Sequence, residues 1–385
     1  MSIGIEFQSV TKQYDAKGKS KAAVDSISFQ VEKGSLTTLL GPSGCGKTTT
    51  LRMIAGLETP SAGRVIIDGQ DVTELGPAER NVSLVFQSYA LFPHMSVLEN
   101  VAYGPSVSGL SKSAAQDKAK VALATVGLTG YELRMPSELS GGQQQRVAVA
   151  RALVLEPSVL LFDEPLSNLD ARLRRQMREE IRGLQQRLKL TVAYVTHDQS
   201  EALAVSDKII VMHQGKIAQQ GSPRELYERP HSEFVAGFMG EAALMKAQQR
   251  SGRLYIGKYL LPDTIGGAGG VPATVGNSLL GSPEAHEVVL AIRPESWHLQ
   301  LAGQPARAPT LVSERSFTSV ADSMRVDTGL QGQVKQATYL GGSYEYTVST
   351  ELGDIFLISP LRAAVAQTGD LVVLSLFAQG VAVLA

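Results

Sequence analysis

The stretch LLGPSGCGKTTTLRMIAG, residues 39–56, constrains the fold most strongly, because it sets a glycine-rich loop between an apolar run and a helical pattern. It fits G-x-x-x-x-G-K-[ST] with Gly41, Gly46, Lys47 and Thr48. SLTTLL before it has the composition of a strand, and TTTLRMIAGL after it has helical spacing. Glycines let backbone N–H groups turn inward around phosphate oxygens, and the N-terminus of the following helix attracts anions. The motif therefore predicts a nucleoside triphosphate site in an α/β protein.

Within this loop, Lys47 is expected to reach the β- and γ-phosphates, and the Thr48 hydroxyl is expected to bind Mg²⁺. The candidate phosphate-binding residues are Gly41, Pro42, Ser43, Gly44, Cys45, Gly46, Lys47, Thr48 and Thr49. Cys45 is the only cysteine, which excludes an intramolecular disulfide and is compatible with a reducing compartment. We expect Cys45 to contribute its backbone and not a nucleophilic thiol. A glycine-rich turn that binds nothing is the alternative.

Composition excludes several classes of protein. The 385 residues suffice for two or three domains, and 43% hydrophobic with 19% charged residues is typical of a globular chain and not of a disordered one. A net charge of −1 gives no overall basic field for nucleic acid. The N-terminus lacks the pattern of a secretion signal. The apolar C-terminal run LVVLSLFAQGVAVLA is shorter than the roughly 20 residues of a membrane-spanning helix and is predicted to be a buried β-hairpin.

The pattern along the chain divides it into two parts. Up to about residue 235, short β-rich runs alternate with helical segments, which predicts βαβ units on a parallel sheet. SVLLF (158–162) and TVAYVT (191–196) are typical of strands buried on both faces, residues 171–190 form a charged, solvated helix, and a hairpin turns at Gln214-Gly215. The sequence then changes to short alternating strands, which predicts a small all-β, barrel-like domain. We place the domains at 1–238 and 239–385.

Two further motifs add chemistry to the phosphate loop. In VLLFDEP, Asp163 and Glu164 end an apolar strand, where the aspartate can hold Mg²⁺ through water and the glutamate can polarise the attacking water. In ELSGGQQQRVAVARAL, a loop ending in Ser140, Gly141 and Gly142 opens a helix and predicts a second anion site. One chain has no evident need for two phosphate cradles. We therefore expect the second to serve the nucleotide of a partner subunit.

In this order the motifs resemble those of the ATPase subunit of an ATP-binding cassette (ABC) transporter, over residues 4–235. The resemblance implies a P-loop NTPase cassette with a parallel sheet core and a helical subdomain. It implies that Tyr14 stacks on adenine, that Gln87 senses Mg²⁺ and the attacking water, and that His197 contacts the γ-phosphate. The implied catalytic residues are Glu164, His197 and Gln87, and the implied metal-binding residues are Thr48, Gln87 and Asp163. The implied residues for the partner's nucleotide are Ser140, Gly141, Gly142, Gln143 and Asp170.

The same resemblance extends beyond the site residues. SNLD, ending at Asp170, stands where many relatives have SALD, and Asn168 leaves the aspartate in place. Leu91, Phe92 and Pro93 are expected in a loop that either packs locally or receives a short helix of a membrane subunit. LAIRPESWHL, with Arg293, resembles the signature of the TOBE-type β-domain of importer ATPases. That domain either only cements the dimer or binds a regulatory ligand.

The resemblance implies an ATP- and Mg²⁺-dependent homodimer bound peripherally to the cytoplasmic face of the inner membrane. Its implied partners are transmembrane permease subunits and, indirectly, an extracytoplasmic solute-binding protein; no nucleic acid is expected. The solute is expected to be a polyamine, ferric iron or a phosphonate rather than maltose. A soluble cassette ATPase acting on ribosomes or DNA is the first alternative, but the chain has no second cassette and no coiled-coil insertion between Gln87 and Ser140. A non-hydrolysing sensor is the second, against which Glu164 and His197 argue.

Overall fold

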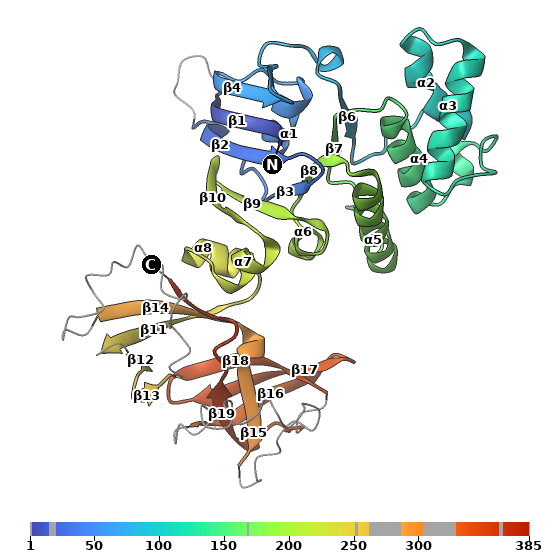
Figure 1. Cartoon of the computed structure of the whole chain (residues 1–385). Helices are drawn as coiled ribbons and strands as arrows, with labels where there is room; N and C mark the ends of the chain where they lie inside the picture. Colours follow the sequence, from blue (N-terminus) through green and yellow to red (C-terminus); the bar gives the residue numbers. More distant parts are fainter. Residues whose placement is uncertain are drawn as a thin grey trace, which may run out of the picture. The chain divides into compact units, whose positions relative to one another are not determined.

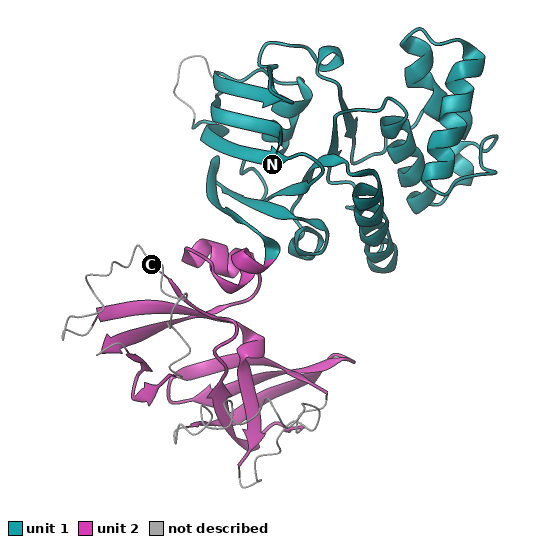
Figure 2. Ribbon diagram, in the orientation of Figure 1, with its two compact units in different colours: residues 1–223 teal, residues 224–385 magenta. Residues whose placement is uncertain are grey.

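The computed structural model describes residues 2–14, 21–167, 169–250, 253–261, 286–302, 329–361 and 365–384. These residues form two compact units, Met1–Pro223 and Arg224–Ala385 (Figure 2). The predicted boundary after residue 238 differs from this division, because the helices α7 (Pro223–Glu228) and α8 (Glu233–Phe238) group with the second unit.

The first unit contains two sheets (Figure 1). The antiparallel sheet has the order β2-β1-β4-β5, formed by β1 (Ile3–Lys12), β2 (Val24–Glu32), β4 (Ala62–Ile67) and β5 (Gln70–Asp71). The second sheet has the order β10-β9-β3-β8-β7-β6, formed by β3 (Leu36–Leu40), β6 (Val82–Val85), β7 (Val159–Asp163), β8 (Thr191–Thr196), β9 (Lys208–His213) and β10 (Lys216–Gly221). All its pairs are parallel except β9 with β10, which confirms the predicted parallel core.

Helix α1 (Lys47–Ala55) packs in the core between these sheets. Leu51, Met53 and Ile54 share one hydrophobic cluster with side chains of β1, β2 and β4 and with inward-facing side chains of β3, β7 and β8. Strand β7 shows why the run around residue 160 is apolar throughout. Leu161 faces the cluster around α1, whereas Leu160 and Phe162 face a second cluster on the other side of the sheet with α5 (Ala171–Leu188). Both faces are buried, as parallel strands require.

Three helices pack together on one side of the first unit: α2 (Val97–Val107), α3 (Lys112–Thr125) and α4 (Gly141–Leu153) (Figure 1). They bury a core of their own, which includes Val101, Leu123 and Val147. The other face of α4 packs on the parallel sheet through Ala148, Val149 and Ala152. This cluster is the helical subdomain that the resemblance implied. The short helix α6 (Gln199–Val205) follows β8, and the 3₁₀ turns Pro77–Glu79 and Pro136–Glu138 lie in loops.

The strands β9 and β10 form the hairpin predicted at Gln214-Gly215. Both turn residues have positive φ, 51° and 83°, as a two-residue hairpin turn with matching twist requires.

The second unit contains two antiparallel five-stranded sheets. One has the order β13-β12-β11-β14-β20, formed by β11 (Ala243–Arg250), β12 (Arg253–Ile256), β13 (Tyr259–Leu260), β14 (His286–Ile292) and β20 (Val381–Leu384). The other has the order β15-β19-β16-β17-β18, formed by β15 (Trp297–Leu301), β16 (Leu330–Tyr339), β17 (Ser343–Thr350), β18 (Gly353–Pro360) and β19 (Leu371–Leu376). Both sheets contribute to one hydrophobic cluster, so they pack face to face. The predicted all-β domain is thus confirmed.

The prediction that the C-terminal apolar run forms a β-hairpin is wrong. β19 pairs with β15 and β16, whereas β20 pairs with β14 in the other sheet. Residues 377–380 carry the chain from one sheet to the other, with Gly380 at φ 81°. Both strands are apolar because each covers the shared core from its own sheet. Within the described residues, every helix is too short or too polar to span a bilayer.

The predicted signature around Arg293 has a structural role inside the second unit. The Arg293 side chain is 2% exposed, and its guanidinium donates to the carbonyl groups of Tyr227, Ala236, Gly240 and Glu241 at 2.8–3.2 Å. It also lies 4.2 Å from the centre of the Tyr227 ring. Buried carbonyls and a buried cation thus satisfy one another. Arg293 therefore joins α7 and α8 to the β-sheets.

Candidate functional site

The phosphate loop connects β3 to α1 and is shaped by two glycines with positive φ. Gly44 has φ 77°, and Gly46, the residue that precedes α1, has φ 104°. A Cβ on Gly46 would lie 2.5 Å from the carbonyl oxygen of Ala23, so the loop has no room there for a side chain. The sequence therefore needs glycine at Gly46 for both its backbone conformation and its packing.

The start of α1 is open to an anion. No side chain caps this fully described helix, and its first turn contains no acidic residue. Its first N–H groups therefore lack the side-chain partners that usually satisfy them, and the positive end of the helix dipole is unopposed. Lys47 is 5% exposed, and its Nζ donates to the carbonyls of Gly41 (2.7 Å) and Pro42 (3.0 Å). The ammonium group is thus held inside the loop.

Tyr14 lies next to this helix. Its hydroxyl is 3.4 Å from the Thr49 hydroxyl, and its ring, which is 61% exposed, lies 5.2 Å from Lys12 Nζ. The structure therefore places an exposed aromatic residue beside the phosphate loop, where the family resemblance implies the adenine contact.

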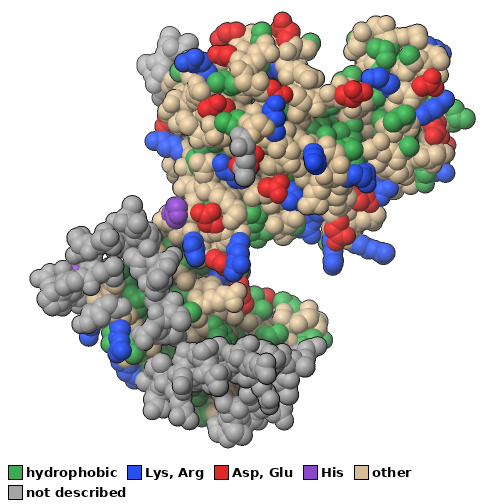
Figure 3. Space-filling view, in the orientation of Figure 1, with side chains coloured by type: hydrophobic (Ala, Val, Ile, Leu, Met, Phe, Trp, Pro, Cys, Tyr) green, Lys and Arg blue, Asp and Glu red, His purple; other side chains and the backbone are tan. Residues whose placement is uncertain are grey.

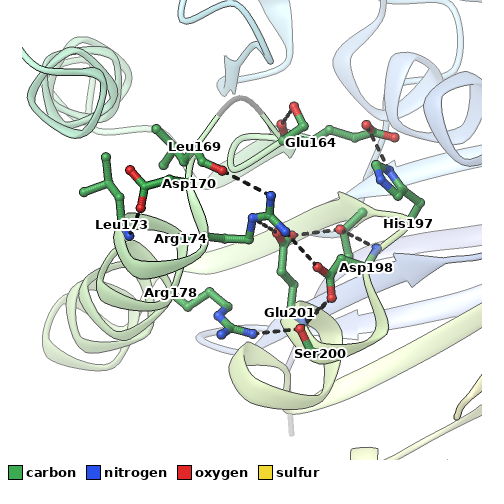
Figure 4. A network of polar contacts seen from close by, with 12 residues as sticks. Glu164, Leu169, Asp170, Leu173, Arg174, Arg178, His197, Asp198, Ser200 and Glu201 are labelled. Carbon is green, nitrogen blue, oxygen red and sulfur yellow. Dashed lines mark hydrogen bonds and ion pairs between the residues drawn. The ribbon is translucent and has the colours of Figure 1, made fainter. Parts of the chain in front are cut away.

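Asp163 and Glu164 lie where β7 ends, as predicted. Burial, followed by the nearby charge of Glu164, raises the pKa of the Asp163 carboxyl. Glu164 has φ 46°, an uncommon conformation for a non-glycine residue, and its N–H donates to the Val195 carbonyl on β8 at 3.0 Å. Its Oε2 lies 3.2 Å from Nδ1 of His197, which follows β8 (Figure 4). The carboxyl ends of β7 and β8 thus bring the predicted base and the predicted histidine into contact.

Gln87 follows β6 and meets the same group of residues through Ser167. The Gln87 Nε2 donates to the Ser167 hydroxyl at 2.9 Å, and this hydroxyl donates to the Glu164 carbonyl at 3.1 Å. Ser167 is a residue of this site that the sequence motifs did not predict. Its position in SNLD, between Glu164 and Asp170, was the available signal.

The loop after Gln87 is strained and clamped. Tyr89 and Ala90 both have positive φ, 60° and 47°. Arg151, in the last turn of α4, donates to their carbonyls at 3.0 and 2.6 Å, and burial lowers the pKa of its guanidinium. Leu91, Phe92 and Pro93 lie in a loop, as predicted, and Asn100 of α2 holds the Phe92 backbone through its N–H (2.8 Å) and carbonyl (3.1 Å).

The predicted second anion site lies at the start of α4, which begins at Gly141 rather than after Gly142. Ser140 accepts from the Gln143 N–H (3.4 Å), and Gln143 Oε1 accepts from the Ser140 N–H (2.9 Å), which is a capping box. The Gln143 side-chain amide donates to Tyr131 at 3.3 Å. The hydrogen bonds of the Ser140 and Gln143 side chains are therefore local and do not reach the phosphate loop of the same chain.

Asp170 likewise has a local contact. Its Oδ1 accepts from the Leu173 N–H at 2.9 Å and caps α5. Asn168 lies outside the described residues. The structure thus gathers Lys47, Gln87, Asp163, Glu164 and His197 at the carboxyl edge of one parallel sheet, while Asp170 and the Ser140–Gln143 segment stand at the starts of two helices.

Comparison with protein families matches both units. The family described as ABC transporter matches residues 24–167, and the TOBE domain matches residues 290–384. The curated relatives include the Fe(3+) ions import ATP-binding protein FbpC of Rhizobium etli, 53% identical over 355 residues, which are 92% of this chain and 90% of that protein. The protein of the same name from Agrobacterium fabrum is 51% identical over 354 residues, with the same coverage.

Solved structures resemble the first unit. The structure of cbiO1 from Clostridium perfringens, described as part of the ABC transporter complex cbiONQ, has a TM-score of 0.55 and 28% identity, over 59% of this chain and 91% of that one. The dimeric ATP-binding cassette MJ0796, in a post-hydrolysis state bound to ADP and Pi, has a TM-score of 0.51 and 30% identity, over 57% of this chain and 99% of that one.

Proposed function

The chain belongs to the ABC transporter family, and we propose that it is the ATP-hydrolysing subunit of a ferric-iron importer. One observation carries the assignment of the hydrolytic site: Glu164, His197 and the Gln87–Ser167 pair meet at the sheet edge that also presents the phosphate loop. The choice of ferric iron as the solute rests on the names of relatives that match about nine-tenths of the chain. A polyamine or a phosphonate is the alternative solute.

Binding of ATP follows from the loop and its neighbours. The N–H groups at the start of α1 and the Lys47 ammonium hold the phosphates, and the exposed Tyr14 ring stacks on adenine. Lys47 Nζ exchanges its present carbonyl partners for phosphate oxygens, so the buried charge keeps hydrogen-bond acceptors in both states.

Hydrolysis needs an activated water at the γ-phosphate. We assign Glu164 as the group that accepts the proton of this water, and Gln87 as the residue that orients it. Nδ1 of His197 faces Glu164, so we assign the other ring nitrogen, Nε2, to a γ-phosphate oxygen. The Ser167 hydroxyl keeps Gln87 in register with Glu164.

The donor set fits Mg²⁺, which prefers oxygen ligands. Thr48 offers a hydroxyl, Gln87 an amide oxygen and Asp163 a carboxylate, and burial raises the pKa of this carboxyl so that a cation beside it would be stabilising. When bound, the ion would neutralise charge on the β- and γ-phosphates. Lys47 and the N–H groups of the loop contribute the rest of the positive field.

The N-termini of α4 and α5 are available for contacts with a second subunit. We propose that Ser140, Gly141, Gly142 and Gln143 meet the nucleotide of a partner copy and that Asp170 lies at the same interface, since their own contacts are local. MJ0796 is a dimer in its solved structures. The further proposed partners are permease subunits and, through them, an extracytoplasmic solute-binding protein, which would hold the chain at the cytoplasmic face of the inner membrane.

The second unit is proposed to regulate or stabilise this dimer. The TOBE match and the clamp formed by Arg293 support one rigid β-domain that carries α7 and α8. We place the functional boundary between residues 238 and 239, after the two helices that the compact second unit includes.

ATP turnover by the purified chain tests the hydrolytic site. Glu164→Gln removes the general base and is expected to lower kcat by about 10²-fold or more with ATP binding retained, whereas Lys47→Ala is expected to abolish nucleotide binding. Phosphate release and equilibrium binding of a fluorescent ATP analogue measure the two effects. Near-normal turnover in Glu164→Gln would reject the assignment of the base, and unchanged binding in Lys47→Ala would reject that of the loop.

The solute is tested in cells. Uptake of radiolabelled ferric iron, a polyamine and a phosphonate is compared in the native organism with and without this gene, complemented by wild type or Glu164→Gln. Loss of ferric-iron uptake alone, restored only by wild type, supports the proposal. Loss of polyamine or phosphonate uptake alone transfers the assignment to that solute, and affinity capture from solubilised membranes then identifies the permease.

A further inference from the structure

A polar network behind the candidate site contains an arginine that no assignment above uses (Figure 4). Arg174 lies in the first turn of α5, and about one-third of its side chain is exposed. Its Nη2 donates to the Leu169 carbonyl at 3.1 Å, and its Nη1 donates to Asp198 Oδ2 at 3.4 Å. Its Nε lies 3.9 Å from Glu201 Oε1. One guanidinium thus contacts the residue before Asp170 and the residue after His197.

The acidic partners of Arg174 are built into the backbone around His197. Asp198 caps α6 by accepting from the Glu201 N–H at 3.1 Å, and Ser200 donates to it at 2.6 Å. Thr196 accepts from the Asp198 N–H at 3.0 Å and donates to Glu201 at 2.8 Å. The residues on both sides of His197 are therefore fixed by the carboxylates that Arg174 contacts.

Glu201 is the buried carboxylate of this network. Its side chain is buried, with the residue 3% exposed, and it accepts from Thr196 and, at 3.3 Å, from Tyr194. A buried carboxylate that loses its cation is costly, so Arg174 cannot leave without consequence. The guanidinium fork can serve Leu169, Asp198 and Glu201 together, whereas the single ammonium group of a lysine reaches one of them at a time.

We propose that Arg174 is a positioning residue that couples the backbone at Leu169 and Asp170 to His197 and, through the His197–Glu164 contact, to the general base. It touches no reacting atom. A displacement of the loop at Leu169 moves the guanidinium, and the guanidinium moves the backbone that carries the imidazole. This inference rests on the proposed hydrolytic function. It gives a displacement of the backbone at Leu169 a direct route to the catalytic group.

A purely structural role is the competing explanation, and lysine separates the two. Arg174→Lys retains a cation near Glu201 but loses the simultaneous contacts to Leu169 and Asp198. We expect it to lower kcat by about tenfold, with KM for ATP and the melting temperature close to wild type. Arg175→Lys is the matched control, because Arg175 lies exposed on the same turn and pairs with Glu179. It should leave kcat, KM and stability unchanged.

A double-mutant cycle tests the route through His197. If Arg174 acts by placing the imidazole, Arg174→Lys should change the rate less than about twofold in a His197→Ala background. Single-turnover measurements on the full chain, with protein in excess over ATP, keep this slow reaction measurable. An unchanged kcat in Arg174→Lys, or the same tenfold loss in both backgrounds, overturns the inference. Failure of the wild-type chain to hydrolyse ATP would instead overturn the proposed function.

Discussion

Two glycines of the phosphate loop allow a matched comparison at the scale of single residues. Both have positive φ, but a Cβ on Gly44 would meet no atom within 4 Å, whereas one on Gly46 would lie 2.5 Å from a backbone oxygen. Gly44→Ala should therefore cost only the backbone strain, about 1–2 kcal/mol of unfolding free energy. Gly46→Ala should cost more and weaken ATP binding strongly. Chemical denaturation and ATP titration measure both variants; equal effects would contradict the packing argument.

Tyr227 is expected to make the stability of the fold depend on pH in the alkaline range. Its hydroxyl donates to the Glu295 carboxylate, and burial followed by this carboxylate raises the pKa of Tyr227 to about 12. The raised value means that the folded state keeps a proton that the unfolded chain loses near pH 10. The stabilisation is therefore complete below about pH 10 and is lost as the pH rises through about 12. Tyr227→Phe should show a shallower loss of stability over this window.

Denaturation at a series of alkaline pH values, with wild type and Tyr227→Phe compared at each, isolates this contribution from the other tyrosines. The near-ultraviolet absorbance of phenolate should also show one late-titrating group in wild type that the variant lacks. A difference between the proteins that stays constant from pH 9 to 12 would contradict the expected proton linkage.

Some residues of the candidate site could be predicted from the sequence and others could not. Lys47, Glu164 and His197 were predictable because each stands in a motif whose chemistry requires that residue type. Ser167 was not, because a serine in a loop has no distinctive chemistry until its two partners, Gln87 and Glu164, are brought together by neighbouring strands. The contacts of Arg174 were hidden for the same reason, since α5 reads as a solvated, charged helix.

At the scale of elements, Arg151 makes α4 hold the loop after Gln87. Arg151→Met should leave the carbonyls of Tyr89 and Ala90 without their charged donor and lower the free energy of unfolding by about 2 kcal/mol. It should also reduce turnover, because the loop carries Gln87. Arg187→Met, which removes an exposed contact to the Thr125 carbonyl, is the control and should change stability by less than about 0.5 kcal/mol. Equal effects would show that the loop needs no clamp.

Helices and strands were predictable where their burial leaves a pattern in the sequence. The pairing of strands was not predictable where the pattern is the same for different pairing partners. β8 and the helix around α5 match their predicted runs closely, because a doubly buried strand and a charged helix differ in composition. The apolar run of β19 and β20 did predict strands, but not their separate sheets. Two strands with a short connection have the same pattern whether they pair with each other or with strands far away in the sequence.

At the scale of the whole molecule, the proposed homodimer should depend on bound ATP. Glu164→Gln traps ATP unhydrolysed and should convert the chain from monomer to dimer on ATP addition, which size exclusion with light scattering measures. Lys47→Ala should remain monomeric at the same ATP concentration. A dimer that forms equally in the absence of ATP would place the association in the second unit instead, as the alternative for the β-domain allows.

Cys45 offers a consequence of a different kind. Its thiol is buried, 3.9 Å from Lys47 Nζ, and burial raises its pKa, so alkylation at neutral pH requires the phosphate loop to open. Because the chain has no other cysteine, every adduct on the intact protein reports this one position. The rate of alkylation thus reports how often the phosphate loop opens. A slower rate in the presence of ATP would measure the fraction of occupied sites in a protein without substitutions, even within a membrane assembly.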